Sequence, residues 1–140
     1  MEHTGNLENY WSNPICCDSF CANQAVPGEY YSKSNIGFED FKEFDFANGF
    51  NKGDIMILAN AKNAEVGEVL VYLANRPDPI IHRVIAKNDN FYKTKGDNNC
   101  ESGDFEQRIP QEKVLGKAVW RLPLLGWVKI FAVELLNLVR

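Results

Sequence analysis

The sequence predicts a mainly β fold, a small curled antiparallel sheet or partly open barrel, with short helices before it and one amphipathic helix after it. Three observations support this prediction. From Asn51 onward, short runs rich in β-branched residues alternate with clusters of Gly, Asn, Asp and Pro, as strands and turns do. The first 50 residues lack that alternation, and residues 127–140 are apolar with polar residues at helical spacing.

Five strands are expected in the β-rich part. Turn sequences such as Asn-Lys-Gly-Asp and Lys-Asn-Asp-Asn separate them. The expected strands are Asp54–Leu58, Glu68–Ala74, Ile80–Lys87, Phe91–Thr94 and Val114–Arg121. Short strands at this spacing are typical of a curled sheet or small barrel.

The first 50 residues are rich in Asn, Ser, Gly and aromatic residues, which predicts loops with short helices. One helix is expected over residues 37–44. Phe38, Phe41 and Phe44 recur there every three residues and would share a face that packs on the domain.

The C-terminal segment from Trp127 predicts an amphipathic helix. Its polar residues Lys129, Glu134, Asn137 and Arg140 fall within about 140° of a helical wheel. The opposite, apolar face could pack on the protein core or lie on a membrane surface, and the sequence leaves both open.

Length and charge limit the classes of function. With 140 residues the chain is expected to form one domain. Its net charge of −4, with scattered Lys and Arg, argues against a nucleic-acid partner. No apolar run is long enough for a membrane-spanning helix, and the polar start is unlike a signal peptide.

The four cysteines, Cys16, Cys17, Cys21 and Cys100, have no spacing typical of a zinc site, and neither histidine stands at such a spacing. We therefore expect no metal and no cofactor. Disulfides and unpaired thiols both remain open, and an extracytoplasmic location would favour disulfides.

Two kinds of motif can carry chemistry. His82 lies in the middle of the strand-like run Pro79–Ile85, and imidazole is the usual general base near neutral pH. The turn Gly96–Asn99 contains Asp97, and Asp104 follows seven residues later. A carboxylate from this loop could orient the imidazole. Each motif also has a purely structural interpretation. A lone histidine in a strand is more often structural than catalytic, and Gly96–Asn99 could be a tight turn whose side chains cap its own backbone.

The order of these motifs gives more information than any one of them. The chain has a Gly-Asp strand at Gly53, a Gly-Glu strand at Gly67, an Ile-His-Arg-Val strand at 81–84 and a Thr-Lys-Gly-Asp-Asn-Asn loop at 94–99. A Leu-Gly-Lys-Ala run and a closing Pro-Leu-Leu-Gly-Trp-Val-Lys-Ile run come after them. In this order the motifs resemble the signal peptidase I family over residues 49–130.

The resemblance is to the archaeal and endoplasmic-reticulum branch, because that branch has His in the His-Arg-Val strand where bacterial members have Lys. It implies His82 as general base. It also implies catalytic roles for Asp97 and Asp104, of which Asp104 is favoured as the partner of the imidazole.

The family's nucleophile is a serine followed by methionine, and no Ser-Met pair exists in the sequence. Ser12, Ser19, Ser32 and Ser34 lie in loop-like sequence without that signature. Since Met1-Glu2-His3 resembles the residues directly after the serine in the family, we expect the nucleophile just before Met1. Residues 7–48 would then be an insertion.

The resemblance implies a serine endopeptidase that removes signal peptides from secretory preproteins at the extracytoplasmic face of a membrane. Its partners would be signal peptides and the membrane surface. The chain without its serine would be inactive, and an inert homologue that binds peptides is the alternative. A self-cleaving Ser-Lys repressor domain is disfavoured by His82. The expected substrate-binding residues are Met1, Ile55, Met56, Ile57 and Ile81.

Overall fold

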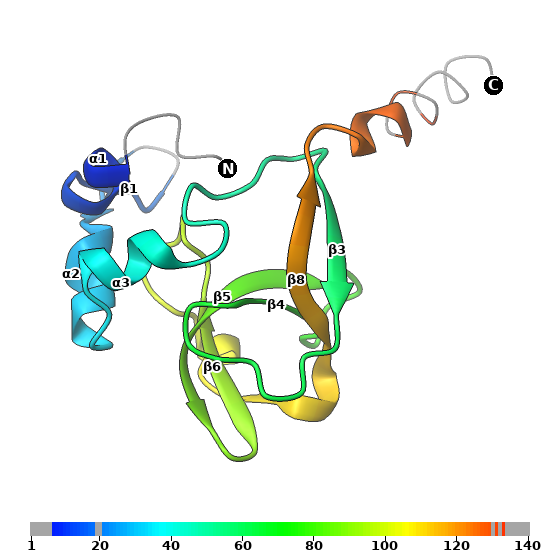
Figure 1. Ribbon diagram of the computed structural model, residues 1–140. Helices are drawn as coiled ribbons and strands as arrows, with labels where there is room; N and C mark the ends of the chain where they lie inside the picture. Colours follow the sequence, from blue (N-terminus) through cyan, green and yellow to red (C-terminus); the bar gives the residue numbers. More distant parts are fainter. Residues whose placement is uncertain (1–6, 19–20, 130, 132, 134–140) are drawn as a thin grey trace.

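The computed structural model describes residues 7–18, 21–129, 131 and 133. The N-terminal segment, defined here as residues 7–48, is short helices with a two-stranded antiparallel sheet (Figure 1). Its elements are α1 (Leu7–Ser12), β1 (Ile15–Cys16), β2 (Gln24–Ala25), α2 (Pro27–Lys33) and α3 (Phe38–Glu43). The expected helix around Phe41 is confirmed as α3.

The rest of the described chain is a six-stranded sheet in which all paired strands run antiparallel. Its strands are β3 (Ile55–Ala59), β4 (Val69–Tyr72), β5 (Ile80–Asn88), β6 (Phe91–Lys95), β7 (Ile109–Pro110) and β8 (Val114–Leu122). Two 3₁₀ helices, η1 (Asp104–Glu106) and η2 (Gln111–Lys113), flank β7. The order β3-β8-β4-β5-β6-β7 leaves β3 and β7 as edges, so the sheet is not closed into a barrel. The mainly β prediction is confirmed.

The backbone conformation explains why glycine stands at the two turns that lead into β3 and β4. Gly53 and Gly67 adopt φ of +95° and +96°, a region that other residues rarely enter. A side chain on Gly67 would also collide with the ring of Phe44. These turns therefore need glycine in order to start their strands.

Strand β5 separates two hydrophobic cores. Val84 belongs to the core that contains Leu70, Tyr72 and Tyr92. Ile85 belongs to the core that the N-terminal segment forms with its aromatic side chains. Successive residues of a strand point to opposite faces, so β5 serves both cores at once. Figure 1 shows the N-terminal helices at one end of the molecule and the β3–β8 ribbon toward the other.

All four cysteines form disulfides, which resolves the alternatives left by the sequence. Cys16 pairs with Cys21 inside the N-terminal segment. Cys17 pairs with Cys100, 83 residues away in the loop after β6. The second bridge therefore joins the N-terminal segment to the loop that follows β6.

The expected C-terminal helix is seen in part. Residues 126–129, 131 and 133 are helical, and the remainder of the expected helix lies outside the described residues. Among the helices that the structure describes, none has the length and apolarity needed to cross a bilayer.

Candidate functional site

Strand alternation places His82 and Arg83 on opposite faces of β5. Leu70 of β4 lies opposite His82, and Lys95 of β6 lies opposite Arg83. The side of His82 holds Thr94 and Tyr72, whose hydroxyls are 2.9 Å apart. The side of Arg83 faces the N-terminal segment, where its guanidinium donates to the carbonyls of Asp45 and Phe46. His82 and Arg83 therefore have different surroundings, although they are adjacent in the chain.

His82 is paired with a carboxylate that the sequence did not single out. Its Nδ1 is hydrogen-bonded to Oε1 of Glu106, the last residue of η1. The Glu106 side chain is 1% exposed and the His82 side chain is 20% exposed. A buried carboxylate accepts from Nδ1–H, so the pair favours the tautomer that leaves Nε2 as an acceptor.

Local backbone chemistry holds Glu106 in place. Its Oε2 accepts the backbone N–H of Gly103 at 2.8 Å, in the manner of a residue that caps the start of a helix three positions earlier. Thr94 donates its hydroxyl toward Oε1 at 3.4 Å. The spacing Gly103-Asp104-Phe105-Glu106 is the one sequence signal that could have indicated this arrangement.

The other ring nitrogen of His82, Nε2, lies against Gly96, and both residues line one pocket. A Cβ built on Gly96 would stand 2.6 Å from Nε2, so only glycine allows the loop to approach the imidazole this closely. The pocket beside it has a volume of about 240 Å³. Besides His82 it is lined by Gly49, Phe50, Val69, Ile81, Asn98 and Asn99 among others.

Asp97 is held by Arg83 and by the N-terminal segment. Arg83 donates to both of its carboxylate oxygens at 2.6 to 3.2 Å, and Tyr31 donates its hydroxyl at 2.6 Å. Burial favours the neutral carboxyl, but Arg83 and Tyr31 outweigh this and hold the pKa of Asp97 below its usual value. Burial and Asp97 together raise the pKa of Tyr31. Asp97 is therefore an ionised anchor on the Arg83 face.

Asp104 begins η1 and is exposed. It lines a separate groove together with Phe105 and Arg108. The loop predicted to supply the imidazole's carboxylate does supply one, at Glu106 two residues further along. The catalytic roles assigned to His82, Asp97 and Asp104 stay predictions.

The substrate-binding residues predicted from the sequence fall in three places. Ile81 lines the pocket at His82. Ile55, Met56 and Ile57 lie on β3, which β8 and β4 separate from β5 in the sheet. Met1 lies outside the described residues.

The serines that the structure describes lie away from the pocket at His82. Ser32 donates to the carbonyl of Gly28, and the buried Ser102 donates to the carbonyl of Thr94. Neither these nor Ser12 and Ser34 line the pocket at His82. Ser19 lies outside the described residues.

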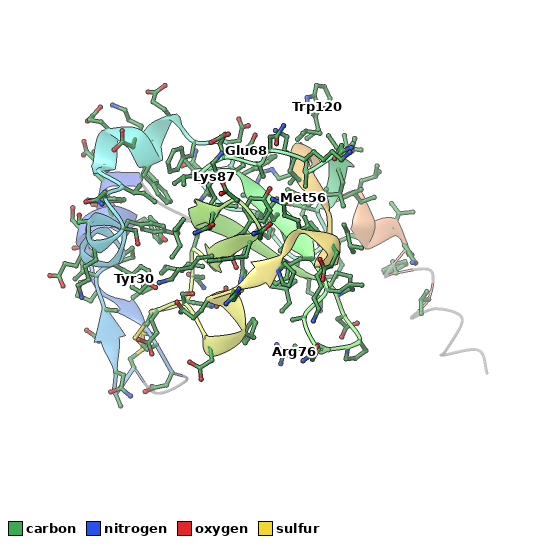
Figure 2. The ribbon with its side chains drawn as sticks, turned by 90° about the horizontal axis from the view of Figure 1, so that it is seen from below. Tyr30, Met56, Glu68, Arg76, Lys87 and Trp120 are labelled. Atoms are coloured by element: carbon green, nitrogen blue, oxygen red, sulfur yellow. A yellow bond between two sulfur atoms is a disulfide. The ribbon has the colours of Figure 1, made fainter. Side chains whose placement is uncertain are left out.

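A second feature is an apolar surface, defined here as the exposed apolar residues of β3, β8 and the helix after β8. Trp120 is 67% exposed and points away from the sheet (Figure 2). Val128 and Phe131 are 67% and 69% exposed. Its other exposed members are Ile55, Ile57, Leu58, Leu115, Val119, Trp127 and Val133. The described part of the C-terminal helix is thus not covered by the core.

An imidazole that is oriented by a buried carboxylate and lines a small pocket is an arrangement that a general acid–base or nucleophilic hydrolase site requires. Among the residues that the structure describes, no cluster of His, Cys, Asp and Glu could hold a metal ion.

The chain is similar in sequence to catalytic subunits of signal peptidase complexes. No family model matches the sequence. The chain is similar to the signal peptidase complex catalytic subunit sec11 of Sclerotinia sclerotiorum, with 34% identity over 98 residues, covering 61% of this chain and 57% of that protein. The sec11 subunit of Pyrenophora tritici-repentis is 35% identical over 100 residues, covering 61% of this chain and 57% of that protein. The SEC11 subunit of Plasmodium falciparum is 32% identical over 97 residues, covering 61% of this chain and 53% of that protein. The chain spans a little more than half the length of these relatives.

Proposed function

We propose that this chain carries the catalytic machinery of a serine-type signal peptidase that cuts signal peptides from secretory preproteins at the extracytoplasmic face of a membrane. The observation that carries the proposal is the imidazole of His82, which lines a pocket while its Nδ1 is bound to Glu106. The similarity to sec11 subunits supports the same reaction.

In this proposal a serine hydroxyl attacks the scissile carbonyl while Nε2 of His82 takes its proton. Glu106 keeps the imidazole in the required tautomer and stabilises the imidazolium that forms. His82 then returns the proton to the leaving amine. In the second half of the reaction, water attacks the ester of the acyl-enzyme while His82 again takes the proton, and the serine is released. The small pocket at Ile81 and Val69 suits a short side chain of the substrate.

The nucleophile in this proposal is a serine of a Ser-Met pair, which the sequence does not contain, and none of the serines that the structure describes lines the pocket at His82. The 140-residue chain should then bind preproteins without cutting them. The test extends the chain upstream of Met1 by the inferred serine and a membrane helix. This extended chain, called the longer protein below, is compared with its His82→Ala variant for cleavage of a preprotein in detergent.

We expect His82→Ala to reduce kcat/KM on the order of 10⁴-fold, as loss of a triad member does in serine proteases. His82→Lys should give little rescue, because a lysine must be desolvated to act as a base. If the 140-residue chain cuts the preprotein and Ser12→Ala stops it, the proposed nucleophile is wrong.

The second candidate is an inert homologue that keeps the fold and the pocket at His82 and binds peptides without cutting them. Isothermal titration with a signal peptide separates the two functions. Binding by the longer protein without any cleavage supports the inert homologue, whereas cleavage excludes it.

We further propose that the apolar surface contacts the membrane on which the substrates lie. Charged substitution of Phe131 should weaken this contact, because a carboxylate resists transfer into the acyl region. Flotation with liposomes is compared for the wild type, Phe131→Asp and the matched control Phe105→Asp, whose ring is also exposed, at 47%, but lies on η1. Equal flotation of all three would contradict the proposal.

A further inference from the structure

Besides its packing on β5 and β6, the N-terminal segment is bonded to the loop of residues 96–106 that follows β6. Tyr10 and Tyr31 both donate their hydroxyls to Asp97, at its carbonyl and its carboxylate. The backbone N–H of Ser102 donates to the hydroxyl of Tyr30 at 3.1 Å. Figure 2 shows Tyr30 on the side of the helices toward this loop.

The Cys17–Cys100 disulfide ties the same loop between these two anchors. Asp97 and Ser102 lie on either side of Cys100 in the chain. The N-terminal segment is therefore bonded to the loop at three successive positions, residues 97, 100 and 102. Cys17 itself is exposed, which makes the bridge accessible to a reductant in solution.

Both edges of the His82 imidazole depend on this loop. Gly96, at one end, lies against Nε2, and Glu106, at the other end, binds Nδ1. The side chain of Ser102 also caps the carbonyl of Thr94 at the end of β6. Displacement of the loop would therefore change the contacts of both ring nitrogens together.

We infer that the N-terminal segment is a positioning element that holds the loop of residues 96–106 against His82, with Tyr31 and the Cys17–Cys100 disulfide as its main positioning groups. The inference rests on the proposed function for its catalytic meaning. Reduction of the bridge by a dithiol yields two thiols and one oxidised dithiol, and it frees the loop from its covalent link to the segment. The Cys16–Cys21 bridge, which spans five residues, holds no part of the loop.

The first test compares Cys17→Ser/Cys100→Ser with the matched control Cys16→Ser/Cys21→Ser. The measurements are hydrogen exchange of the amides of residues 96–106 and the NMR signal of the Nδ1 proton of His82, neither of which needs proteolysis. We expect at least tenfold faster exchange of the loop amides and loss of the Nδ1 proton signal when the Cys17–Cys100 bridge is absent. The control should keep both. Equal behaviour of the two variants would overturn the inference.

The second test removes a single hydroxyl and so stays informative where a disulfide variant does not fold. Tyr31→Phe deletes the donor to Asp97. Tyr92→Phe is the matched control, because its buried hydroxyl donates to the carbonyl of Ala61, away from the loop. We expect faster exchange of the loop amides in Tyr31→Phe alone, and unchanged exchange there would contradict the positioning role of Tyr31.

Activity of the longer protein distinguishes this inference from the proposed function. A positioning role predicts that Tyr31→Phe lowers kcat about tenfold with little change in KM, and that Tyr92→Phe leaves both unchanged. If the longer protein cuts no preprotein while the exchange results hold, the proposed function fails and the positioning role stands.

Discussion

At the scale of single residues, the structure changes which carboxylate is expected to act with His82. The family resemblance implied catalytic roles for the acids after the Gly-Asp-Asn-Asn turn, Asp97 and Asp104, and Asp104 was favoured as the partner of the imidazole. The structure turns Asp104 toward a separate groove and binds the imidazole through Glu106. Glutamate is one methylene longer than aspartate, and the short helix η1, which contacts β6, brings Glu106 to the imidazole.

Substitution of Glu106 by Gln tests this assignment. Gln keeps the size of the side chain but offers an amide in place of a carboxylate, which favours the wrong tautomer of His82 and leaves the imidazolium without a counter-charge. We expect kcat/KM of the longer protein to fall on the order of 10³-fold or more, by analogy with the triad aspartate of serine proteases.

Asp104→Asn is the matched control, since it removes one carboxylate from the same helix. Its kcat/KM should remain within a few-fold of the wild type. A loss as large as that of Glu106→Gln would restore Asp104 as the catalytic acid.

At the scale of elements, the strands were predictable because their signal is local. Alternating β-branched residues and Gly-Asp or Asn-Asp turns specify β3 to β6 and β8 without knowledge of their neighbours. The strand β7 was missed because two residues, Ile109 and Pro110, carry no period. Helices α1 and α2 have six and seven residues and, unlike α3 with Phe38, Phe41 and Phe44, no repeat of one residue type that marks a face.

The site itself was only half predictable, for a reason of distance in the chain. His82 and Asp97 could be found from motifs that each lie within one strand or turn. The link between His82 and Glu106 depends on how the loop folds back through Ser102 and Gly103, and no local pattern fixes that path. The pairing of Cys17 with Cys100 likewise joins segments whose proximity exists only in the folded chain.

At the scale of the whole molecule, the sheet and the N-terminal segment meet at two buried cations, Arg83 and Lys95. Lys95 of β6 is fully buried, and its amine lies 5.1 and 4.7 Å from the ring centres of Tyr30 and Tyr31. It donates to the carbonyl of Gly96 at 3.1 Å. Burial lowers the pKa of Lys95 to about 8, against the attraction of Asp97 and Glu106. The contact between the sheet and the N-terminal segment therefore carries an electrostatic cost near neutral pH.

This cost predicts how stability depends on pH. The unfolded chain holds the Lys95 proton up to its ordinary pKa of 10.5, whereas the folded chain releases it near 8. Between these values the unfolded state binds more protons, so the free energy of unfolding rises with pH. We expect a gain of about 1 to 2 kcal/mol between pH 7 and 9.5 from this group. Above about pH 10 the sign reverses, because burial raises the pKa of Tyr10, Tyr31 and Tyr72 and only the unfolded chain ionises them.

Urea unfolding of the 140-residue chain at pH 7, 8, 9 and 9.5, with the disulfides intact, measures this dependence. Lys95→Met keeps the length of the side chain and removes the charge, so the variant should be flat or falling over the same range. It should also exceed the wild type in stability most clearly at pH 7, since there the wild type carries the full cost of a buried ammonium. The prediction is contradicted if the free energy of unfolding of the wild type does not change from pH 7 to 9.5 and the curve of Lys95→Met runs parallel to it. That result would show that the amine of Lys95 is hydrated and is not buried between the sheet and the N-terminal segment.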